Sequence, residues 1–286
     1  MSSRNNDISE FIFEKERMLM DLLATYGSVA VAYSGGVDST YLAAVAHEIL
    51  GAKAHMVLAD SPSIPRSEVE EASAIAWEQQ WNFNVLHTQE FEQEAFLKND
   101  GRRCYFCKNE LFTRMRRFAN EHDVAVLAYG AMADDALDPT RLGHVAAREH
   151  AVTAPLQDVG LTKDEIRMLS RRRGLRTASK ASFACLSSRF PTGDRIEVAE
   201  LSKVEQAEEV LKQLGFHQYR ARHHGDTCRI EVGKDEIPRL LKPAVRRLVA
   251  KGVRDAGYQY VTLDLGGYRT GNAARKPANE PETIII

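Results

Sequence analysis

The sequence has few cysteines, no long apolar run and almost no net charge. Only four of its 286 residues are cysteine, too few for a disulfide scaffold in a chain of this length, which indicates a reducing compartment. We find no run of about 18 apolar residues, and the polar start MSSRNNDISEF is unlike a signal peptide, so no membrane segment is expected. The net charge of −2 excludes a positive electrostatic potential over the whole chain that would bind nucleic acid. We expect a cytoplasmic protein with neither a membrane nor nucleic acid as its partner.

Strands and helices alternate through the first two thirds of the chain. Apolar runs typical of strands occur at 29–33, 54–60, 84–88 and 124–130, with a candidate fifth at 150–156. Segments with helical spacing separate them, and Thr162 with Glu165 predicts a capping box that starts a helix over 162–174. This alternation predicts an α/β fold, with helices on both faces of a parallel sheet.

After residue 190 the pattern changes. A helix is expected over 198–216, a hairpin over 218–233, another helix over about 236–256 and a last strand over 258–268. Helices alternating with mostly antiparallel strands are typical of a small α+β domain. We predict an N-terminal domain over 1–185, a smaller α+β domain over 186–272 and a flexible tail over 273–286.

A glycine-rich segment, SGGVDS at 34–39, joins the first apolar run to a helical segment. Its glycines let the backbone turn sharply, and their amides can bind an anion together with the helix N-terminus. The segment lacks the lysine of a Walker A loop, and a carboxylate beside a phosphate needs a cation such as Mg²⁺. A tight turn without a ligand is the alternative. The predicted phosphate and magnesium site consists of Ser34, Gly35, Gly36, Asp38 and Ser39.

Two cysteines form a CxxC pair, Cys104 and Cys107, and a third, Cys185, lies in SFACLSSRFPTG. Such a pair is typical of a redox site, half a zinc site or iron–sulfur ligands, or its members are simply buried. The polar segment before the pair is unlike the strand that precedes a thioredoxin redox pair. A zinc site of this type usually has a second pair of cysteines. Three cysteines with one open position suit a [4Fe–4S] cluster that keeps one iron free. Cys228 alternates with apolar positions, which predicts a place in the core.

The segment SGGVDS resembles the phosphate loop of the PP-loop ATPases, which cleave ATP between its α and β phosphates and adenylylate a substrate. A longer set of motifs resembles the LarE family over nearly the whole chain: CYFCK, SSRFPTG, YRARHH, RIEV and YVTLDLGGYRTG. Members of that family are ATP-dependent sulfurtransferases that build the nickel-pincer nucleotide of lactate racemase. The resemblance implies a Rossmann-like PP-loop ATPase domain that uses ATP and Mg²⁺.

The reaction implied by this resemblance is sulfur incorporation into a pyridinium-3,5-biscarboxylic acid mononucleotide. A carboxylate is adenylylated with release of pyrophosphate, and sulfur then displaces AMP to leave a thiocarboxylate. Some members sacrifice the sulfur of a cysteine before SSRFP, whereas others hold a [4Fe–4S] cluster with three cysteines. Cys104, Cys107 and Cys185 match the three-cysteine type, and Ala184 stands where the sacrificial cysteine is expected. The cluster is therefore favoured, with a sacrificial Cys185 as the alternative.

Strand ends and charged residues supply further candidates. Ligands of open α/β sheets lie at the carboxyl ends of the strands, so Ala59 and Gly130 are expected to line the adenosine of ATP. Arginine binds phosphate with two-pronged donors, and Arg220 and Arg222 alternate on one face of a predicted strand. That face is a candidate phosphate site for the mononucleotide.

The segment around SSRFP adds two more candidates, Ser188 and Arg189, for the substrate phosphate or the leaving AMP. Glu208 and Glu231 match acidic positions of the family, and the resemblance implies a divalent ion bound by Glu208 at a subunit axis. It also implies a homo-oligomer, and a downstream enzyme that inserts nickel is a candidate partner.

Three rival functions stay open on the sequence alone. A tRNA thiolase would share ATP and adenylylation, but the net charge of −2 and the lack of a basic RNA-binding domain argue against it. An amidating ligase would have no use for three cysteines. A sulfur carrier or metal-storage protein that merely binds nucleotide would not turn over ATP.

Overall fold

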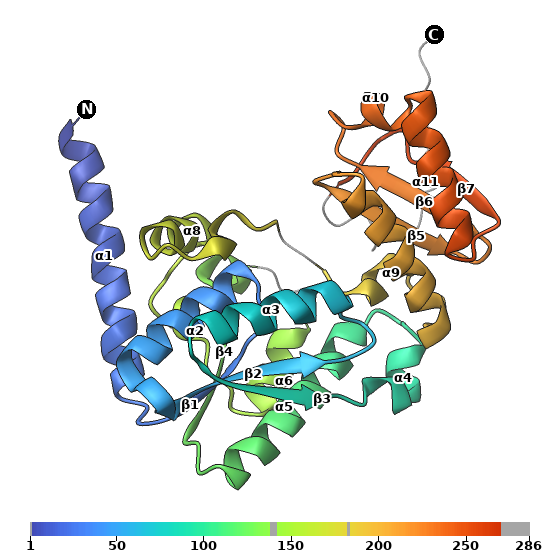
Figure 1. The fold of residues 1–286 in the computed structure, drawn as a ribbon. Helices are drawn as coiled ribbons and strands as arrows, with labels where there is room; N and C mark the ends of the chain where they lie inside the picture. The colour runs from blue at the N-terminus through green and yellow to red at the C-terminus, as the bar shows by residue number, and fades with distance from the viewer. Residues whose placement is uncertain (1, 138–141, 182–183, 270–286) are drawn as a thin grey trace. The chain divides into compact units, whose positions relative to one another are not determined.

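The computed structural model describes residues 2–137, 142–181 and 184–269, and the predicted tail over 273–286 lies outside them (Figure 1). The chain divides into two compact units. The first unit comprises Met1–Gln93 and Arg102–Phe183, and the second comprises Glu94–Gly101 and Ala184–Ile286. The segment Glu94–Gly101 belongs to the second unit although its neighbours on both sides belong to the first, which no pattern in the sequence predicts.

Four parallel strands form the sheet of the first unit, in the order β3-β2-β1-β4. Their bounds are β1 Val29–Ala32, β2 Ala54–Asp60, β3 Asn82–His87 and β4 Val126–Tyr129. Strand β1 lies between β2 and β4, and all of its residues are buried. A strand covered on both faces has to be apolar throughout, which explains why VAVA has no polar position. The predicted α/β fold with a parallel sheet is confirmed.

Helices cover both faces of this sheet. The helices of the first unit are α1 Ser2–Ala24, α2 Val37–Leu50, α3 Arg66–Glu78, α5 Arg103–Glu121, α6 Gly143–Glu149, α7 Pro155–Asp158 and α8 Lys163–Arg172. Short 3₁₀ turns lie at Gly51–Lys53, Glu90–Glu92, Ala133–Leu137 and Arg176–Ser179. None of the helices that the structure describes is long and apolar enough to cross a membrane.

The alternating side chains of β1 separate the two helix layers. Val29 and Val31 pack in one core with apolar residues of α1, α2, α3 and α8. Ala30 and Ala32 pack in another core with residues of α5 and α6. Successive strand residues point to opposite faces, so β1 contacts one helix layer with its valines and the other with its alanines.

The candidate strand over 150–156 is wrong. Within the described residues, a single parallel bridge joins Ala128 to Thr153 in place of a ladder. Pro155 starts α7, and a proline has no N–H to donate to a sheet.

The helix expected over 162–174 is confirmed as α8. The side chain of Thr162 accepts a hydrogen bond from the Glu165 N–H, and the Glu165 carboxylate accepts one from the Thr162 N–H. Gly174 lies just beyond the helix with a φ of +67°, a conformation that suits glycine.

The second unit is a small α+β domain. Its elements are α4 Glu94–Leu97, a 3₁₀ turn Leu186–Arg189, α9 Val198–Gln213, β5 Tyr219–His224, β6 Thr227–Val232, α10 Ile237–Leu240, α11 Pro243–Asp255 and β7 Tyr260–Leu263. The strand order is β5-β6-β7; the hairpin β5–β6 is antiparallel as predicted, whereas β6 and β7 are parallel. Cys228 is fully buried in this unit's core, as its alternation predicts.

The helix expected over 236–256 is two helices. Lys242 has an extended backbone (φ −57°, ψ 131°) because a residue before proline avoids the helical region, and α11 starts at Pro243. The first of the two helices, α10, is only four residues long.

Candidate functional site

The glycine-rich loop lies between β1 and α2, and two of its contacts allow no side chain. Gly35 has a φ of +68°, and a Cβ there would lie 2.7 Å from the Ala72 Cβ. A Cβ at Gly130, which follows β4, would lie 3.0 Å from the Ser39 nitrogen. These close approaches explain why glycine occupies both positions, and they bring the end of β4 against the loop.

Two serine hydroxyls organise the loop from within. Ser39 Oγ accepts a hydrogen bond from the Ser34 N–H at 3.1 Å and lies 3.0 Å from Ser34 Oγ. Gly36 caps the N-terminus of α2 with an extended backbone and no side chain. The first turn of α2 therefore presents backbone N–H groups beside two hydroxyls, an arrangement that suits a phosphate.

Asp38, in the first turn of α2, is ion-paired with a lysine that the sequence analysis does not single out. Lys163 Nζ donates to both carboxylate oxygens of Asp38, at 2.7 and 2.8 Å. Lys163 is the first residue of α8, and its backbone N–H donates to Asp134 at 2.8 Å. The N-terminus of α8 therefore holds the ammonium group of Lys163 beside the loop.

A second lysine contacts the loop from the segment after α8. Lys180 Nζ donates to the Gly35 carbonyl at 3.3 Å and lies 2.7 and 3.0 Å from carboxylate oxygens of Glu68 and Glu71 on α3. Its side chain is only 15% exposed. The loop is therefore held from α3, α8 and the segment at residue 180.

The carboxyl ends of β2 and β4 supply the other candidates of the first unit. Ala59 is half-buried near the end of β2, and the next residue, Asp60, accepts a hydrogen bond from Arg66 at 2.5 Å. Tyr129, the last residue of β4, lies 2.7 Å from the His144 ring through its hydroxyl. Burial raises the pKa of Tyr129 to about 12, so its hydroxyl is protonated at neutral pH. Ala59 and Gly130 lie at the carboxyl ends of β2 and β4, on either side of β1, at the edge where ligands of such folds bind.

The CxxC pair lies at the beginning of α5. Cys104 is exposed and Cys107 is half-buried, and both carry thiols. Residues three apart on a helix share a face, so the two sulfur atoms are suited to one metal centre. Cys185 is half-buried and lies in the second unit, immediately before the 3₁₀ turn Leu186–Arg189. Within the described ranges, no three His, Cys, Asp or Glu side chains gather to hold a metal ion, so the three-cysteine set stays a prediction.

In the second unit, Arg189 forms a buried ion pair with Glu208. Its side chain has no exposed surface, and two of its nitrogens donate to the two Glu208 oxygens at 2.8 and 2.9 Å. The third nitrogen donates to the carbonyls of Ala184 and Cys185, at 2.5 and 2.9 Å, and to Ser188 Oγ. Glu208 also accepts from the Ala221 N–H. Arg189 therefore fixes the backbone around Cys185.

A second buried pair joins β5 to β6. Arg222 donates to Glu231 at 3.0 Å, and Glu231 is fully buried. Another nitrogen of Arg222 donates to the Ser188 carbonyl at 3.0 Å. Arg220 is buried on the same strand, with its guanidinium 4.9 Å from the centre of the Tyr268 ring, and burial lowers its pKa. The structure brings Ser188, Arg189, Arg220 and Arg222 of the sequence prediction into one cluster with Glu208 and Glu231.

Two relatives cover almost the whole chain. An uncharacterized protein of Synechocystis is 34% identical over 96% of this chain and 98% of its own length. The pyridinium-3,5-bisthiocarboxylic acid mononucleotide synthase of Lactiplantibacillus plantarum is 30% identical over 90% of this chain and 92% of its own length. The chain belongs to the family of this synthase, the LarE family. It is an enzyme of that sulfurtransferase family, as its motifs predict.

A more distant relative matches part of the chain. The GMP synthase of Thermotoga maritima is 23% identical over 60% of this chain, which spans 37% of that protein. No family model matches the chain.

Lys163 and Lys180 are the site residues that sequence reasoning missed. Asp38 and Lys163 are 125 residues apart, so only the fold brings them together. The one local signal for Lys163 is its position as the first residue of α8, directly after the helix cap Thr162. Lys180 has no comparable signal, because nothing in its own segment predicts a contact with Gly35.

Proposed function

We propose that this LarE-family chain incorporates sulfur into a pyridinium-3,5-biscarboxylic acid mononucleotide in an ATP-dependent reaction, for a nickel-pincer cofactor. The observation that carries the proposal is the 30% identity, over 90% of the chain, to a protein named pyridinium-3,5-bisthiocarboxylic acid mononucleotide synthase. The phosphate loop supports it, since adenylylation of a carboxylate requires a site for the phosphates of ATP.

In the first step, a substrate carboxylate attacks the α phosphorus of ATP, and pyrophosphate leaves. The loop amides and the hydroxyls of Ser34 and Ser39 would hold the phosphates. The Asp38 carboxylate is the kind of oxygen donor that Mg²⁺ binds, and Mg²⁺ supplies neutralisation of phosphate charge. Lys163 donates to Asp38 in the structure, and it would donate to the phosphates of ATP once Asp38 takes a cation instead.

In the second step, sulfur attacks the acyl carbon, the acyl–oxygen bond breaks, and AMP leaves with the electron pair. Cys104 and Cys107 would ligate a [4Fe–4S] cluster together with Cys185, and such a cluster supplies sulfide held at an open iron position. The exposed Cys104 and the half-buried Cys107, on one face of α5, fit two of the three ligand positions. Arg189 fixes the carbonyls of Ala184 and Cys185, so it is a positioning residue for the third thiol.

The arginines of β5 are the proposed site for the phosphate of the mononucleotide. Arg220 and Arg222 are buried with Ser188 close by, and a guanidinium binds phosphate with paired donors. Arg222 and Arg189 hold carboxylates and Arg220 contacts the Tyr268 ring, so a bound phosphate would add to these contacts or replace them. The divalent ion proposed for Glu208 and Glu231 would have to displace a guanidinium from each of them.

Substrate-dependent ATP cleavage tests this proposal. The protein, purified and assayed without oxygen, is incubated with ATP, Mg²⁺ and either the biscarboxylated pyridinium mononucleotide or bulk tRNA. We expect AMP and pyrophosphate only with the mononucleotide. Cleavage stimulated by tRNA alone would favour the thiolase alternative, and cleavage with neither substrate would overturn the adenylylation step.

The source of sulfur is tested by the mass of the protein after turnover. An unchanged mass is expected, because a cluster passes on sulfide without loss of a cysteine sulfur. Conversion of Cys185 to dehydroalanine would establish the sacrificial alternative. The cytoplasmic location remains a prediction of the sequence composition, and the homo-oligomer and the nickel-inserting partner remain predictions of the family resemblance.

A further inference from the structure

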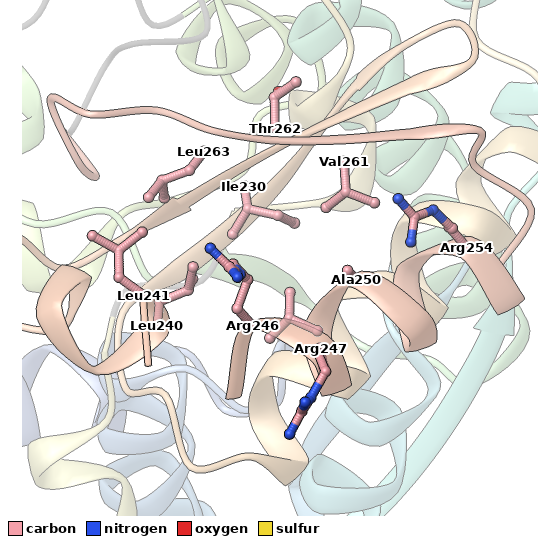
Figure 2. A pocket seen from close by; sticks show the side chains of 11 residues that line it. Ile230, Leu240, Leu241, Arg246, Arg247, Ala250, Arg254, Val261, Thr262 and Leu263 are labelled. Atoms are coloured by element: carbon pink, nitrogen blue, oxygen red, sulfur yellow. The ribbon is translucent and has the colours of Figure 1, made fainter. Parts of the chain in front are cut away.

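The second unit has a pocket that contains none of the residues assigned above (Figure 2). Its volume is about 330 Å³, and it lies between α11, the end of α10 and β7. The floor is apolar, with Ile230 from β6, Val249 from α11 and Val261 and Leu263 from β7. A pocket with an apolar floor and a few polar groups around it is typical of a binding site.

Among the residues that the structure describes, no strand pairs with the outer edge of β7, which lines one side of this pocket. β7 is the last strand of the sheet order β5-β6-β7. The N–H groups of Tyr260 and Asp264 point to β6, where they donate to the carbonyls of Asp226 and Ile230. The alternate residues, Val261 and Leu263, therefore direct their backbone N–H and C=O groups to the open side. An open edge can pair with an added strand.

The opposite wall carries positive charge that nothing in the described chain balances. Arg246, Arg247 and Arg254 of α11 line the pocket, and within the described residues no hydrogen bond or ion pair engages their guanidinium groups. Lys251 on the same helix, by contrast, pairs with Asp255 at 2.5 Å. In Figure 2, Arg246 is drawn on the side of the pocket where Leu240 lies, and Arg254 on the side where Val261 lies.

We propose that this groove binds an extended acidic segment of a partner protein, added to β7 as a further strand. The open edge would supply main-chain hydrogen bonds, the floor would take an apolar side chain, and the arginines would pair with carboxylates. The charge of the groove and the row of backbone groups together favour a peptide over a small anion, which could use the arginines but not the strand edge.

The spacing of the arginines predicts the spacing of the acidic residues in the bound segment. Arg246 and Arg254 are eight residues apart on one helix, which corresponds to about 12 Å along its axis. Side chains four residues apart on a strand lie on the same face, about 13 Å apart. Two carboxylates flanking a central apolar residue, in the order acidic-x-apolar-x-acidic, therefore match the two arginines and the floor between them.

Two peptides of identical composition test this inference with the full-length protein. The peptide GSETITESG places both glutamates on the same face as the isoleucine, whereas GSTEIETSG places them on the opposite face. With a fluorescent label on each, we expect GSETITESG to bind at least tenfold more tightly in an anisotropy titration. Equal affinities, or no binding of either peptide at millimolar concentration, would overturn the proposal.

Variants of the protein separate the groove from general charge attraction. We expect R246Q/R254Q to abolish the difference between the peptides and K251Q on the same helix to preserve it. V261P removes one outward N–H without breaking a hydrogen bond to β6, so this variant is also expected to lose its affinity for the peptide GSETITESG. Loss of binding in K251Q to the same degree as in R246Q/R254Q would contradict the assignment.

The oligomeric state tests whether a second copy of this chain occupies the groove. Light scattering of R246Q/R254Q is expected to match the wild type, because a partner segment and not a second copy occupies the groove. A change in oligomeric state in that variant would mean that the face joins copies of this chain, and it would overturn the proposed peptide site.

Discussion

The phosphate loop of the first unit and the arginine–glutamate cluster of the second unit hold their charges in different ways. Asp38 and Lys163 keep 19% and 26% of their side-chain surface exposed, whereas Arg189 and Glu208 keep 0% and 5%. An exposed lysine pair is worth little in stability and can be rearranged by a ligand. A buried two-pronged arginine pair cannot lose one partner without leaving a charge in the core.

This difference indicates that the two groups of charges have different functions, one in ligand binding and one in holding the backbone. The loop's ions are suited to exchange partners when phosphates arrive, so they should matter for activity more than for stability. The cluster's ions hold the backbone at Ala184 and Cys185 in place, so they should matter for stability as well. Substitutions in the two regions test that distinction.

The substitution R189M should give the largest loss of stability. Glu208 would stay buried without its partner, which costs about 3–5 kcal/mol. Hydrogen exchange of the β5 and β6 amides, followed by mass spectrometry, measures the loss in this unit.

The matched control for this prediction is R195M. Arg195 also pairs with a glutamate, Glu94, but both are about half exposed, so a loss below about 1 kcal/mol is expected. A double variant R189M/E208L should recover much of the stability, because an apolar pair leaves no buried charge. Equal losses in R189M and R195M would remove the distinction between the buried cluster and an exposed ion pair.

The substitution D38N should reduce substrate-dependent AMP formation by about 10²–10³-fold, as expected when a charge that organises the transition state is removed. Thermal stability should stay within about 1 kcal/mol of the wild type, since the Asp38–Lys163 pair is partly exposed. D134N is the control, because within the described residues Asp134 accepts a hydrogen bond from the Lys163 backbone and none from its ammonium group. A large loss of stability in D38N would show that the loop pair is structural.

The substitution G35A should destabilise the first unit by about 1–3 kcal/mol. The added Cβ would meet Ala72, and a positive φ is unfavourable for alanine. The double variant G35A/A72G removes the collision but not the backbone strain, so its melting temperature should lie between those of G35A and the wild type. A melting temperature of G35A equal to the wild type would mean that the loop adapts freely.

Acidification should weaken the second unit slightly. Burial lowers the pKa of His223, which stacks on Phe190 with ring centres 4.7 Å apart, from its usual value of 6.5. The unfolded chain therefore binds a proton at higher pH than the folded one, and stability is lost as the pH falls below 6.5. Urea midpoints at several pH values from neutral downward measure this loss, and H223Q should flatten the profile. A profile of H223Q as steep as that of the wild type would assign the pH dependence to other groups.

Local pattern predicted the regular elements of the fold well. The all-apolar VAVA run, the glycine turn after it and the capping box of Thr162 all form as expected, because each depends on neighbours in the sequence. Failures occurred where a proline acts: Pro155 replaces the expected strand by a helix start, and Pro243 divides an expected helix.

Long-range contacts account for what the sequence did not reveal in the site. Glu208 and Arg189 were predicted separately, as an ion ligand and a phosphate ligand, and the structure pairs them across 19 residues. Lys180 meets the Gly35 carbonyl across 145 residues, which no local periodicity encodes. Residue types are therefore readable from motifs, whereas their partners require the fold.

The most direct test of the proposed function is the product itself. Protein purified without oxygen is incubated with ATP, Mg²⁺ and the biscarboxylated pyridinium mononucleotide, and the small molecules are analysed by mass spectrometry. We expect a mononucleotide in which sulfur replaces a carboxylate oxygen, formed together with AMP. A sample that cleaves ATP but returns the mononucleotide with both carboxylates unchanged would contradict it.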